Sequence, residues 1–386
     1  MAACLLDLTR LVSRLGRGPL TGVDRVEAAY LDRLLAGDDP AFGLVRSKLG
    51  YLLLDRVGMQ GLHQVLHSGA LQPADLLSRL SHRRDPLRAK AEAATRRLAV
   101  ARGPHLRRLL RHLPAGAVYL NVGHANLLGL AAMKAAGLRV VVLVHDVIPL
   151  DYPQFTKAGI APVFRRKLGA VAAHADLVVY STRDAQQRAE AHLARMGRVP
   201  RGVVASLGVP VPQPDRAALP PQIDLRPPYM VTLGTVEPRK NHALLLDVWD
   251  LQPAVRLLIL GGRGWAEPDL FTRIAATPGV EWHAGLSDGA VAAVLEGAAA
   301  LLAPSLAEGF GLPVVEAAAL GVPIIATDLA VTRDLLGDYP VYLDATDRYS
   351  WLETIVAQGM GADDGRRRRI TPPSWEDHFN AVLSLV

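Results

Sequence analysis

The chain has 386 residues, half of them hydrophobic, and carries a formal net charge of +6. This length exceeds the size at which one core usually stops growing, so we expect two domains, each with its own core. The single cysteine, Cys4, excludes an internal disulfide framework and a cysteine-rich metal site, and it fits a reducing compartment.

The N-terminal stretch "MAACLLDLTRLVSR" mixes acid and base into its apolar run and lacks a charged lead-in, so we predict no signal peptide. No apolar run reaches the roughly 18 to 20 uncharged residues that a membrane-spanning helix needs. We therefore expect a cytoplasmic protein. Its positive charge permits anionic partners such as nucleotides, nucleic acid or lipid headgroups.

Short β-branched runs alternate with Ala- and Leu-rich stretches through residues 1–205. The clearest runs are "AVYLNV", "RVVVLVHDV" and "ADLVVYST". This alternation is typical of a parallel sheet covered by helices. We assign residues 1–205 to one Rossmann-like domain.

One segment of this first half is strongly basic. From Arg79 to Arg111 the chain has eleven Lys or Arg residues, opposed only by Asp85 and Glu92, and leucines follow at helical spacing at Leu106, Leu109, Leu110 and Leu113. The pattern predicts a basic amphipathic helix within 79–113. Such a helix either covers a core with its charged face in solvent or docks on an anionic membrane surface, and the sequence fits both readings.

Eight prolines lie between Pro200 and Pro228, so this segment can form neither a helix nor a central strand. We assign 206–228 to an interdomain linker. After it, "YMVTLGT", "VRLLILGG", "VEWHAG", "AALLAPS" and "PIIATD" read as strands, each followed by a helical stretch. These define a second Rossmann-like domain over 229–370, and 371–386 is predicted as a C-terminal helix that packs back toward the first domain.

The predicted fold class is α/β, with two parallel-sheet domains facing a cleft. In open parallel sheets, ligands bind outside the carboxyl ends of the strands. We therefore expect the functional site at strand ends that border the cleft between the domains.

The stretch "LAEGFGLPVVEAAALGVPIIAT" predicts a strand, a glycine loop and a helix. Pro313 falls in the first helical turn and Gly321 just past the helix end. Gly309 and Gly311 let the backbone approach a ligand, and the amides of Gly311, Leu312 and the first turn favour an anion such as a diphosphate. Two carboxylates, Glu308 and Glu316, flank this cradle and can accept hydrogen bonds from the hydroxyls of a nucleotide sugar.

This stretch, with Glu308 and Glu316 separated by seven residues, resembles the signature of the retaining glycosyltransferases of family four, which have the two-domain GT-B fold. The stretch "LGTVEPRKNHALLLDVW" resembles the branch that contains many bacterial mannosyl- and rhamnosyltransferases of surface polysaccharides. The resemblance is specific in the second half, moderate at "LVHDVIPLDYP" and loose over the first hundred residues. It implies that the second domain binds the donor and the first domain the acceptor.

The resemblance implies roles for residues of the second domain. Glu308 would contact hydroxyls of the donor sugar and Glu316 the nucleoside ribose, while Arg239 and Lys240 would hold the diphosphate and stabilise its growing charge. Many relatives carry arginine after the glycine of the first strand, whereas Thr235 follows Gly234 here, and Arg239 is expected to do that work. The expected donor-binding residues are Gly22, Gly234, Thr235, Gly309, Phe310, Gly311, Leu312 and Glu316.

In the first domain, His145 follows a predicted buried strand and faces the expected cleft. The resemblance places the matching histidine at the donor sugar, near the reacting carbon, so His145 joins Glu308, Arg239 and Lys240 as a catalytic candidate. Gly22 in "TGVDRV" would approach the diphosphate, although Thr21 as a helix N-cap explains that motif nearly as well. "NVGHAN" supplies Asn121, His124 and Asn126 as candidate acceptor contacts.

We expect no metal and no cofactor, since basic side chains would replace the divalent ion. The resemblance implies retention through a front-side mechanism in which the leaving diphosphate helps to deprotonate the acceptor. The first expectation for the donor is GDP-mannose and the second dTDP-rhamnose. A saccharide or lipid-linked oligosaccharide is the expected acceptor, and an anionic membrane surface is a partner that 79–113 would contact from the cytoplasmic side.

Three other classes of function explain fewer of these sequence features. A catalytically inactive nucleotide-binding subunit of a polysaccharide assembly complex would not need Glu308, Lys240 and His145 together. An oxidoreductase would show Gly-x-Gly-x-x-Gly after the first strand, which "SRLGRGPLTG" fits only by stretching. Nucleic-acid binding is not expected, because the basic segment lacks interleaved aromatic residues.

Overall fold

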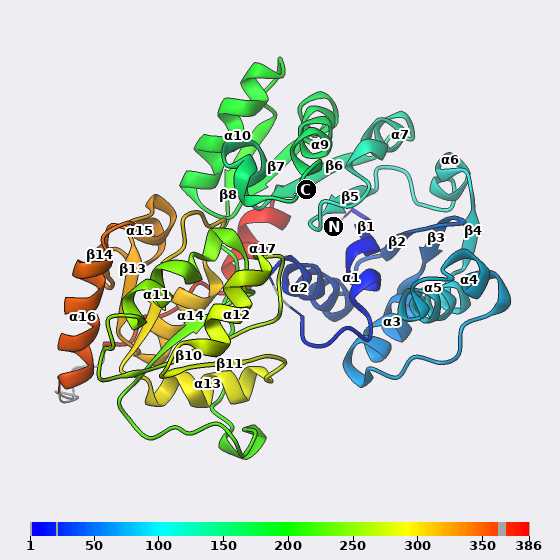
Figure 1. The fold of residues 1–386 in the computed structure, drawn as a ribbon. Coiled ribbons are helices and arrows are strands. Elements are labelled where there is room, and N and C mark those ends of the chain that lie inside the picture. Colours follow the sequence, from blue (N-terminus) through cyan, green and yellow to red (C-terminus); the bar gives the residue numbers. More distant parts are fainter. Residues whose placement is uncertain (1, 21, 362–367, 386) are drawn as a thin grey trace.

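A computed structural model describes residues 2–20, 22–361 and 368–385 of the chain and places them in two α/β domains that lie side by side (Figure 1). Each domain is built around one sheet, and helices cover both faces of each. The predicted α/β class with two Rossmann-like parallel-sheet domains is confirmed. Every strand that the sequence patterns predicted is present.

In the described residues, the first domain holds an eight-stranded sheet with the order β4-β3-β2-β1-β5-β6-β7-β8. All neighbours are parallel except β3, which pairs antiparallel with β2 and β4 through a hairpin that the sequence analysis did not predict. The strands are β1 (Cys4–Asp7), β2 (Ala41–Ser47), β3 (Gly50–Leu54), β4 (Ala101–Gly103), β5 (Val118–Asn121), β6 (Arg139–Val144), β7 (Leu177–Tyr180) and β8 (Arg201–Val204).

Helices cover this sheet and begin where the sequence supplies a cap. Asp55, Asp75, Asp85 and Thr182 each accept a hydrogen bond from a backbone amide of the first turn of the helix that follows. The helices are α1 (Thr9–Arg14), α2 (Val23–Ala36), α3 (Arg56–Ser68), α4 (Leu76–Ser81), α5 (Pro86–Leu98), α6 (Leu106–Leu110), α7 (Leu130–Ala135), α8 (Ile148–Asp151), α9 (Ile160–His174) and α10 (Arg183–Arg195).

The single basic amphipathic helix predicted within 79–113 is wrong. The segment contains the end of α4, then α5, β4 and α6, because Asp85 caps a new helix at Pro86 and Pro104 interrupts the chain again. The predicted apolar stripe of Leu106, Leu109, Leu110 and Leu113 packs into the core of the first domain. These leucines are therefore not available to a membrane.

The described part of the proline-rich linker 206–228 contains one turn of 3₁₀ helix, η3 (Arg216–Ala218), and no strand. Leu207, Val209 and Ile223 of the linker are buried in the core. These apolar side chains anchor the linker, whereas its prolines and polar residues between them are largely exposed or half-buried.

The described second domain has a six-stranded parallel sheet with the order β11-β10-β9-β12-β13-β14. The strands are β9 (Tyr229–Leu233), β10 (Arg256–Leu260), β11 (Val280–His283), β12 (Ala300–Ala303), β13 (Ile324–Thr327) and β14 (Val341–Leu343). The helices are α11 (His242–Trp249), α12 (Pro268–Ala276), α13 (Asp288–Gly297), α14 (Leu312–Leu320), α15 (Ala330–Leu336) and α16 (Arg348–Met360). The strand order reverses between β9 and β12, so this is the point at which the fold favours ligand binding.

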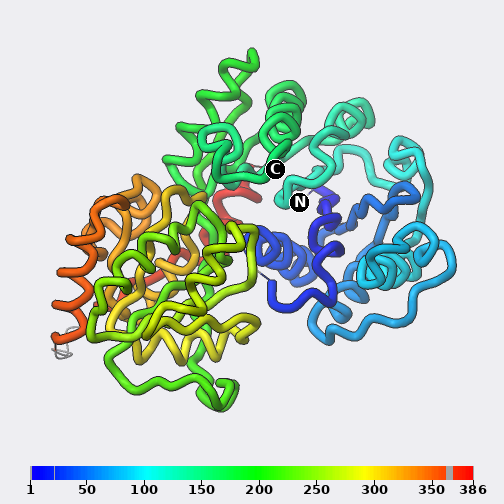
Figure 2. The backbone as a smooth tube through the Cα atoms, viewed as in Figure 1, coloured from blue at the N-terminus to red at the C-terminus, as the bar shows by residue number. Residues whose placement is uncertain are grey.

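The C-terminal helix α17 (Trp375–Leu383) packs against α2 of the first domain, and Figure 2 shows this red segment beside the blue helix. The Tyr30 hydroxyl lies 2.8 Å from Nε2 of His378, and the Phe379 ring meets the Tyr30 ring edge-on. Nδ1 of His378 lies 3.2 Å from the carbonyl of Ala205. The end of the chain therefore ties the second domain to the first.

Candidate active site

Two loops of the second domain meet at the reversal of strand order. The loop after β9 turns sharply at Gly234, whose φ of 144° favours glycine, and continues into η4 (Pro238–Lys240). The loop after β12 carries Glu308 and ends at Gly311, which caps α14 with a φ of 91°. Because β9 and β12 are neighbours, their loops place Arg239 and Lys240 against Glu308.

Glu308 is bound on both oxygens. Its Oε2 accepts from Nη1 of Arg239 at 2.8 Å, and its Oε1 accepts from Nζ of Lys240 at 2.5 Å and from Oγ of Ser305 at 2.7 Å. Arg239 also pairs with Glu237 at 2.7 Å and donates to the carbonyl of Ala307. Three of the four predicted catalytic side chains thus form one hydrogen-bonded cluster.

The cluster controls the charge of Glu308. Burial alone would raise the pKa of this carboxyl, but the Lys240 and Arg239 charges outweigh it and hold the pKa at about 2. Burial likewise disfavours charge on Arg239, yet Glu308 and Glu237 raise its pKa above the ordinary value. The site therefore holds Glu308 as a carboxylate between Arg239 and Lys240, and these side chains are largely shielded from water.

The first domain contributes His145 and Asp146, which follow β6. Gly309 approaches them so closely that an added Cβ would lie 2.9 Å from Oδ2 of Asp146 and 3.1 Å from the carbonyl oxygen of His145. Across the same gap, Oγ of Ser181 donates to the Gly309 carbonyl at 3.5 Å. The absence of a side chain at position 309 is what lets the two domains meet here.

His145 is buried and neutral. Its Nε2 donates to the carbonyl of Val122 at 2.6 Å, and burial lowers its pKa to about 4. The His124 ring lies 5.1 Å from the His145 ring, and its Nε2 donates to the Leu143 carbonyl. A neutral imidazole with fixed Nε2–H leaves Nδ1 of His145 as its hydrogen-bond acceptor.

Glu316, the second carboxylate of the motif, sits in α14 and faces the first domain. Nη1 of Arg25 in α2 reaches its Oε1 at 2.6 Å, and Nη2 of Arg25 lies 3.7 Å from Asp288. Burial raises the pKa of Glu316, against the opposing charge of Arg25. The sequence analysis missed Arg25, although a basic residue in the first turn after the glycine loop was a signal that could have found it.

A large groove opens beside the Arg25–Glu316 pair. It has a volume of about 1070 Å³ and lies between α2, the linker, the start of α13 and α17, with Leu312, Asp288 and Arg25 in its lining. Gly22 precedes α2 with a φ of 46°, and no atom lies within 4 Å of the position of a Cβ added there. Thr21, the alternative N-cap, lies outside the described residues, and Phe310 is buried in the core.

The candidate acceptor residues have different surroundings. The Asn121 amide is fully buried and donates to the Tyr119 hydroxyl at 2.8 Å, while the Asn126 amide donates to Oδ2 of Asp7 at 2.6 Å. Both asparagines thus support a buried network at the ends of β1 and β5. Asn126 also borders a separate pocket of the first domain, whereas His124 is half-buried near His145.

Among the described residues, no group of three His, Cys, Asp or Glu side chains is placed to hold a metal ion. None of the helices that the structure describes is long and apolar enough to cross a membrane.

Comparison with solved structures identifies the class of fold. Alr3699/HepE from Anabaena, solved with UDP and glucose, superposes with a TM-score of 0.62 and 15% identity over 100% of this chain and 95% of its own. The lipopolysaccharide outer core galactosyltransferase WaaB superposes with a TM-score of 0.57 and 15% identity over the full length of both chains. The chain has the GT-B fold.

Sequence comparison finds a family model and curated relatives that match part of the chain. Residues 217–347, which hold Arg239, Lys240, Glu308 and Glu316, match the model of the family described as glycosyl transferases group 1. The serotype-specific mannosyltransferase WbdA of Escherichia coli is 29% identical over 232 residues, covering 55% of this chain and 28% of WbdA. The O-antigen chain mannosyltransferase B of Escherichia coli is 31% identical over 153 residues, which cover 34% of this chain and 40% of that protein. The chain thus matches less than half the length of these relatives.

Proposed function

We propose that the protein is a glycosyltransferase that moves a hexose from a nucleotide-diphosphate sugar to a saccharide or lipid-linked acceptor in polysaccharide biosynthesis. The observation that carries this proposal is the cluster of Arg239, Lys240 and Glu308 facing His145 across the gap between the domains. The group 1 family match over the same residues and the two mannosyltransferase relatives support it.

The cluster suits the chemistry of a leaving diphosphate. Two half-buried cations, Arg239 and Lys240, can bind the diphosphate and stabilise the charge that grows on it as the glycosidic bond breaks. We infer that these cations supply the charge that a metal supplies in other enzymes, so transfer is metal-independent. Glu308 is then released to accept hydrogen bonds from hydroxyls of the donor sugar, beside the His145 carbonyl.

We further propose a retaining, front-side mechanism in which the departing diphosphate takes the proton of the attacking acceptor hydroxyl. The new glycosidic bond forms on the face from which the diphosphate leaves. Arg239 and Lys240 neutralise the diphosphate in this step, and Gly309 lets the two domains close around it. GDP-mannose is the proposed donor, with dTDP-rhamnose second, because both E. coli relatives are mannosyltransferases by name.

Donor binding requires a rearrangement of the cluster. The two cavities that border Glu308 have volumes of about 30 and 20 Å³, which is room for one or two water molecules and too little for a diphosphate. Arg239 and Lys240 must therefore exchange Glu308 for the phosphate oxygens. The nucleoside end would extend past Glu316 into the groove beside Arg25.

A thermal-shift panel of nucleoside diphosphates and nucleotide sugars tests the proposal, since a ligand of the native state raises the melting temperature with its affinity. The proposed function predicts stabilisation by one nucleoside diphosphate and by its sugar derivative. Absence of any shift across the panel would contradict it. Donor turnover by the same protein separates an active enzyme from an inactive nucleotide-binding subunit.

We also propose that the protein works at the cytoplasmic face of an anionic membrane, through exposed residues of 79–113 and the adjoining start of α4. The buried stripe cannot contribute, but Leu76, Leu77 and Leu80 of α4 are 70%, 60% and 51% exposed. Three exposed arginines lie beside them, at Arg79, Arg83 and Arg84. Apolar side chains next to basic residues suit the headgroup region of an anionic leaflet, where each basic residue contributes about 1 kcal/mol.

A further inference from the structure

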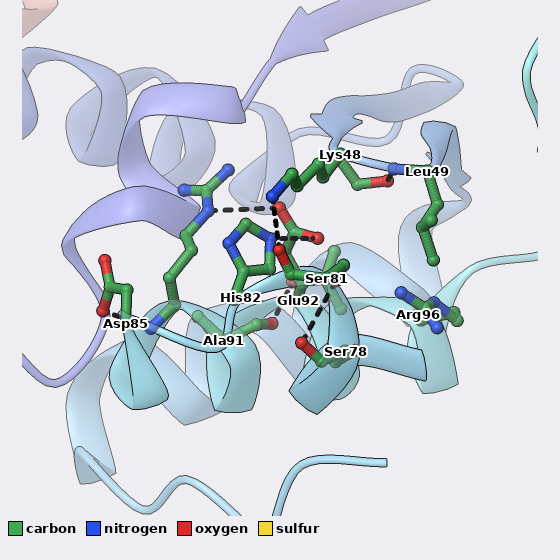
Figure 3. Close-up of polar contacts among 12 residues, drawn as sticks. Lys48, Leu49, Ser78, Ser81, His82, Asp85, Ala91, Glu92 and Arg96 are labelled. Carbon is green, nitrogen blue, oxygen red and sulfur yellow. Dashed lines mark hydrogen bonds and ion pairs between the residues drawn. The ribbon is translucent and has the colours of Figure 1, made fainter. Parts of the chain in front are cut away.

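A second polar pocket lies in the first domain and has no role in donor binding. It has a volume of about 390 Å³ and lies between the β2–β3 turn, the α4–α5 region and the loop after β5. Figure 3 shows part of its wall, where Lys48 of the turn lies opposite His82 and Glu92. The side chains that argue for its role are Arg46, Lys48, His82, Arg88, Glu92 and Lys167.

The pocket carries an excess of positive charge. Its lining has four cations, Arg46, Lys48, Arg88 and Lys167, and Glu92 is the one carboxylate among the lining residues that the structure describes. Glu92 is already engaged, with Nε of Arg88 at 3.2 Å and Nε2 of His82 at 3.0 Å. The remaining cations therefore have no counter-charge within the pocket.

Cationic side chains of the pocket also offer hydrogen-bond donors to a ligand. Nη1 of Arg88 is buried and has no hydrogen-bond partner among the described residues. Arg46 and Lys48 are exposed in the lining of the pocket. Nζ of Lys48 donates to the carbonyl of Ser81 at 2.5 Å. Burial lowers the pKa of Lys167, and the charges of Arg10 and Arg46 lower it further. An anion in the pocket would satisfy all of these groups.

The pocket is adjacent to the reacting centre. Nζ of Lys167 donates to the His124 carbonyl at 2.8 Å, and the His124 ring contacts the His145 ring. Asn126, at the end of the same loop, lies in the lining. A ligand whose anionic end binds in the pocket can thus extend a hydroxyl group toward His145 and the donor sugar.

We propose that this pocket binds a phosphate or diphosphate ester carried by the acceptor, so that the acceptor is a phosphorylated or diphosphate-linked saccharide. The proposal rests on the proposed function, because it assigns the second substrate of the same transfer. Arg46 and Lys48 lie at the mouth and bind the outer oxygens, while Arg88 and Lys167 bind from the inner wall. The same chemistry could serve a phospholipid headgroup, and the experiment separates the two sources.

The test compares two acceptor probes that differ only in the anion. One is a short-chain alkyl diphosphate ester of mannose and the other is the alkyl mannoside without the diphosphate. Their binding is measured by calorimetry with the donor site filled by the nucleoside diphosphate that stabilises the protein. The diphosphate probe should bind the wild-type protein, and Arg46→Gln with Lys48→Gln should weaken it more than about tenfold, since hydrogen bonds to charged groups are lost.

A matched control is Arg107→Gln with Arg108→Gln, which removes the same charge from exposed positions of α6 outside the pocket. The control should bind the probe as the wild type does, and the single Arg46→Gln variant should weaken binding to an intermediate degree. Equal affinity for the two probes, or equal loss in the pocket and control variants, would overturn the proposal. A pocket variant that loses sedimentation with phosphatidylglycerol vesicles but keeps probe affinity would also overturn it, in favour of a lipid headgroup.

A measurement of nucleotide binding distinguishes failure of the anion-site proposal from failure of the proposed function. The pocket variants should bind the nucleoside diphosphate with wild-type affinity, because Arg46 and Lys48 lie outside the donor site. A wild-type protein that binds the diphosphate probe but no nucleotide would refute the proposed function and not the anion site. One that binds the nucleotide but neither probe would refute the anion site alone.

Discussion

Replacing Glu308 with glutamine tests the ion cluster directly. Its pKa of about 2, against an ordinary value of 4.5, corresponds to about 3 kcal/mol in favour of the charged form in the folded protein. That contribution to stability is present above pH 4.5 and is lost as the pH falls toward 2. Glutamine cannot supply it, so Glu308→Gln should lower the melting temperature and leave Arg239 and Lys240 without their main carboxylate.

The same change should have opposite effects on binding and turnover. In this variant a diphosphate no longer competes with the Glu308 carboxylate for the two cations, so the affinity for nucleoside diphosphate should rise by about tenfold to a hundredfold. The upper limit corresponds to the loss of about 3 kcal/mol of ion pairing with Glu308. Turnover should fall strongly, because charge-assisted hydrogen bonds to the reacting sugar are lost. Titration calorimetry and a coupled assay of nucleoside diphosphate release measure the two quantities.

The control is Glu296→Gln, which removes a carboxylate from an exposed ion pair with Arg216 in the same domain. Neither affinity nor turnover should change in this variant. If Glu308→Gln turns over at the wild-type rate, Glu308 does not contact the reacting sugar. If nucleotide affinity falls instead of rising, the cations do not exchange Glu308 for phosphate, and the reasoning from the cluster is refuted.

Four further outcomes are expected. Lys240→Ala should weaken nucleoside diphosphate binding by about 1.5 to 3 kcal/mol in calorimetry, the usual value for a hydrogen bond to a charged group, and equal affinity would place the diphosphate elsewhere. Gly309→Ala should lower kcat while nucleotide binding persists, because the added Cβ would lie 2.9 Å from Asp146; unchanged kcat would show that this approach is not needed for transfer. Treatment with EDTA should leave activity intact, whereas loss that manganese or magnesium restores would contradict the two-cation argument. Sedimentation with anionic vesicles should fall with added salt and with Arg79, Arg83 and Arg84 changed to glutamine, whereas equal sedimentation with neutral vesicles would exclude the membrane proposal.

The secondary structure of the second domain could be predicted from the sequence because it depends on local patterns. Each strand is a short apolar run, and Pro313 and Gly321 mark the ends of α14. The glycine loop before α14 and the basic turn after β9 lie at the ends of neighbouring strands, so their convergence follows from the parallel sheet. Local patterns therefore predicted both the elements and the cluster around Glu308.

The first domain was less predictable because its features depend on long-range contacts. The leucines of α6 would have helical spacing whether the helix covered a core or docked on a membrane. Only the packing of α6 on the sheet determines that they are buried. The antiparallel edge of the sheet is completed by β4, which pairs with β3 from about fifty residues away in sequence. Arg25 had a local signal in its position after the glycine loop, but its pairing with Glu316 across the domains depends on the fold. Arg46 and Lys167 come together only in the folded sheet, so no local pattern could reveal their pocket.

The proposed transferase activity is tested most directly by the release of nucleoside diphosphate from a panel of nucleotide sugars, measured with the purified wild type and with Lys240→Ala. The proposed function predicts release from one sugar donor, GDP-mannose first, at a rate that rises with a diphosphate-linked acceptor and falls strongly in the variant. Tight nucleotide binding without release from any donor of the panel would contradict it and leave the protein as an inactive nucleotide-binding subunit.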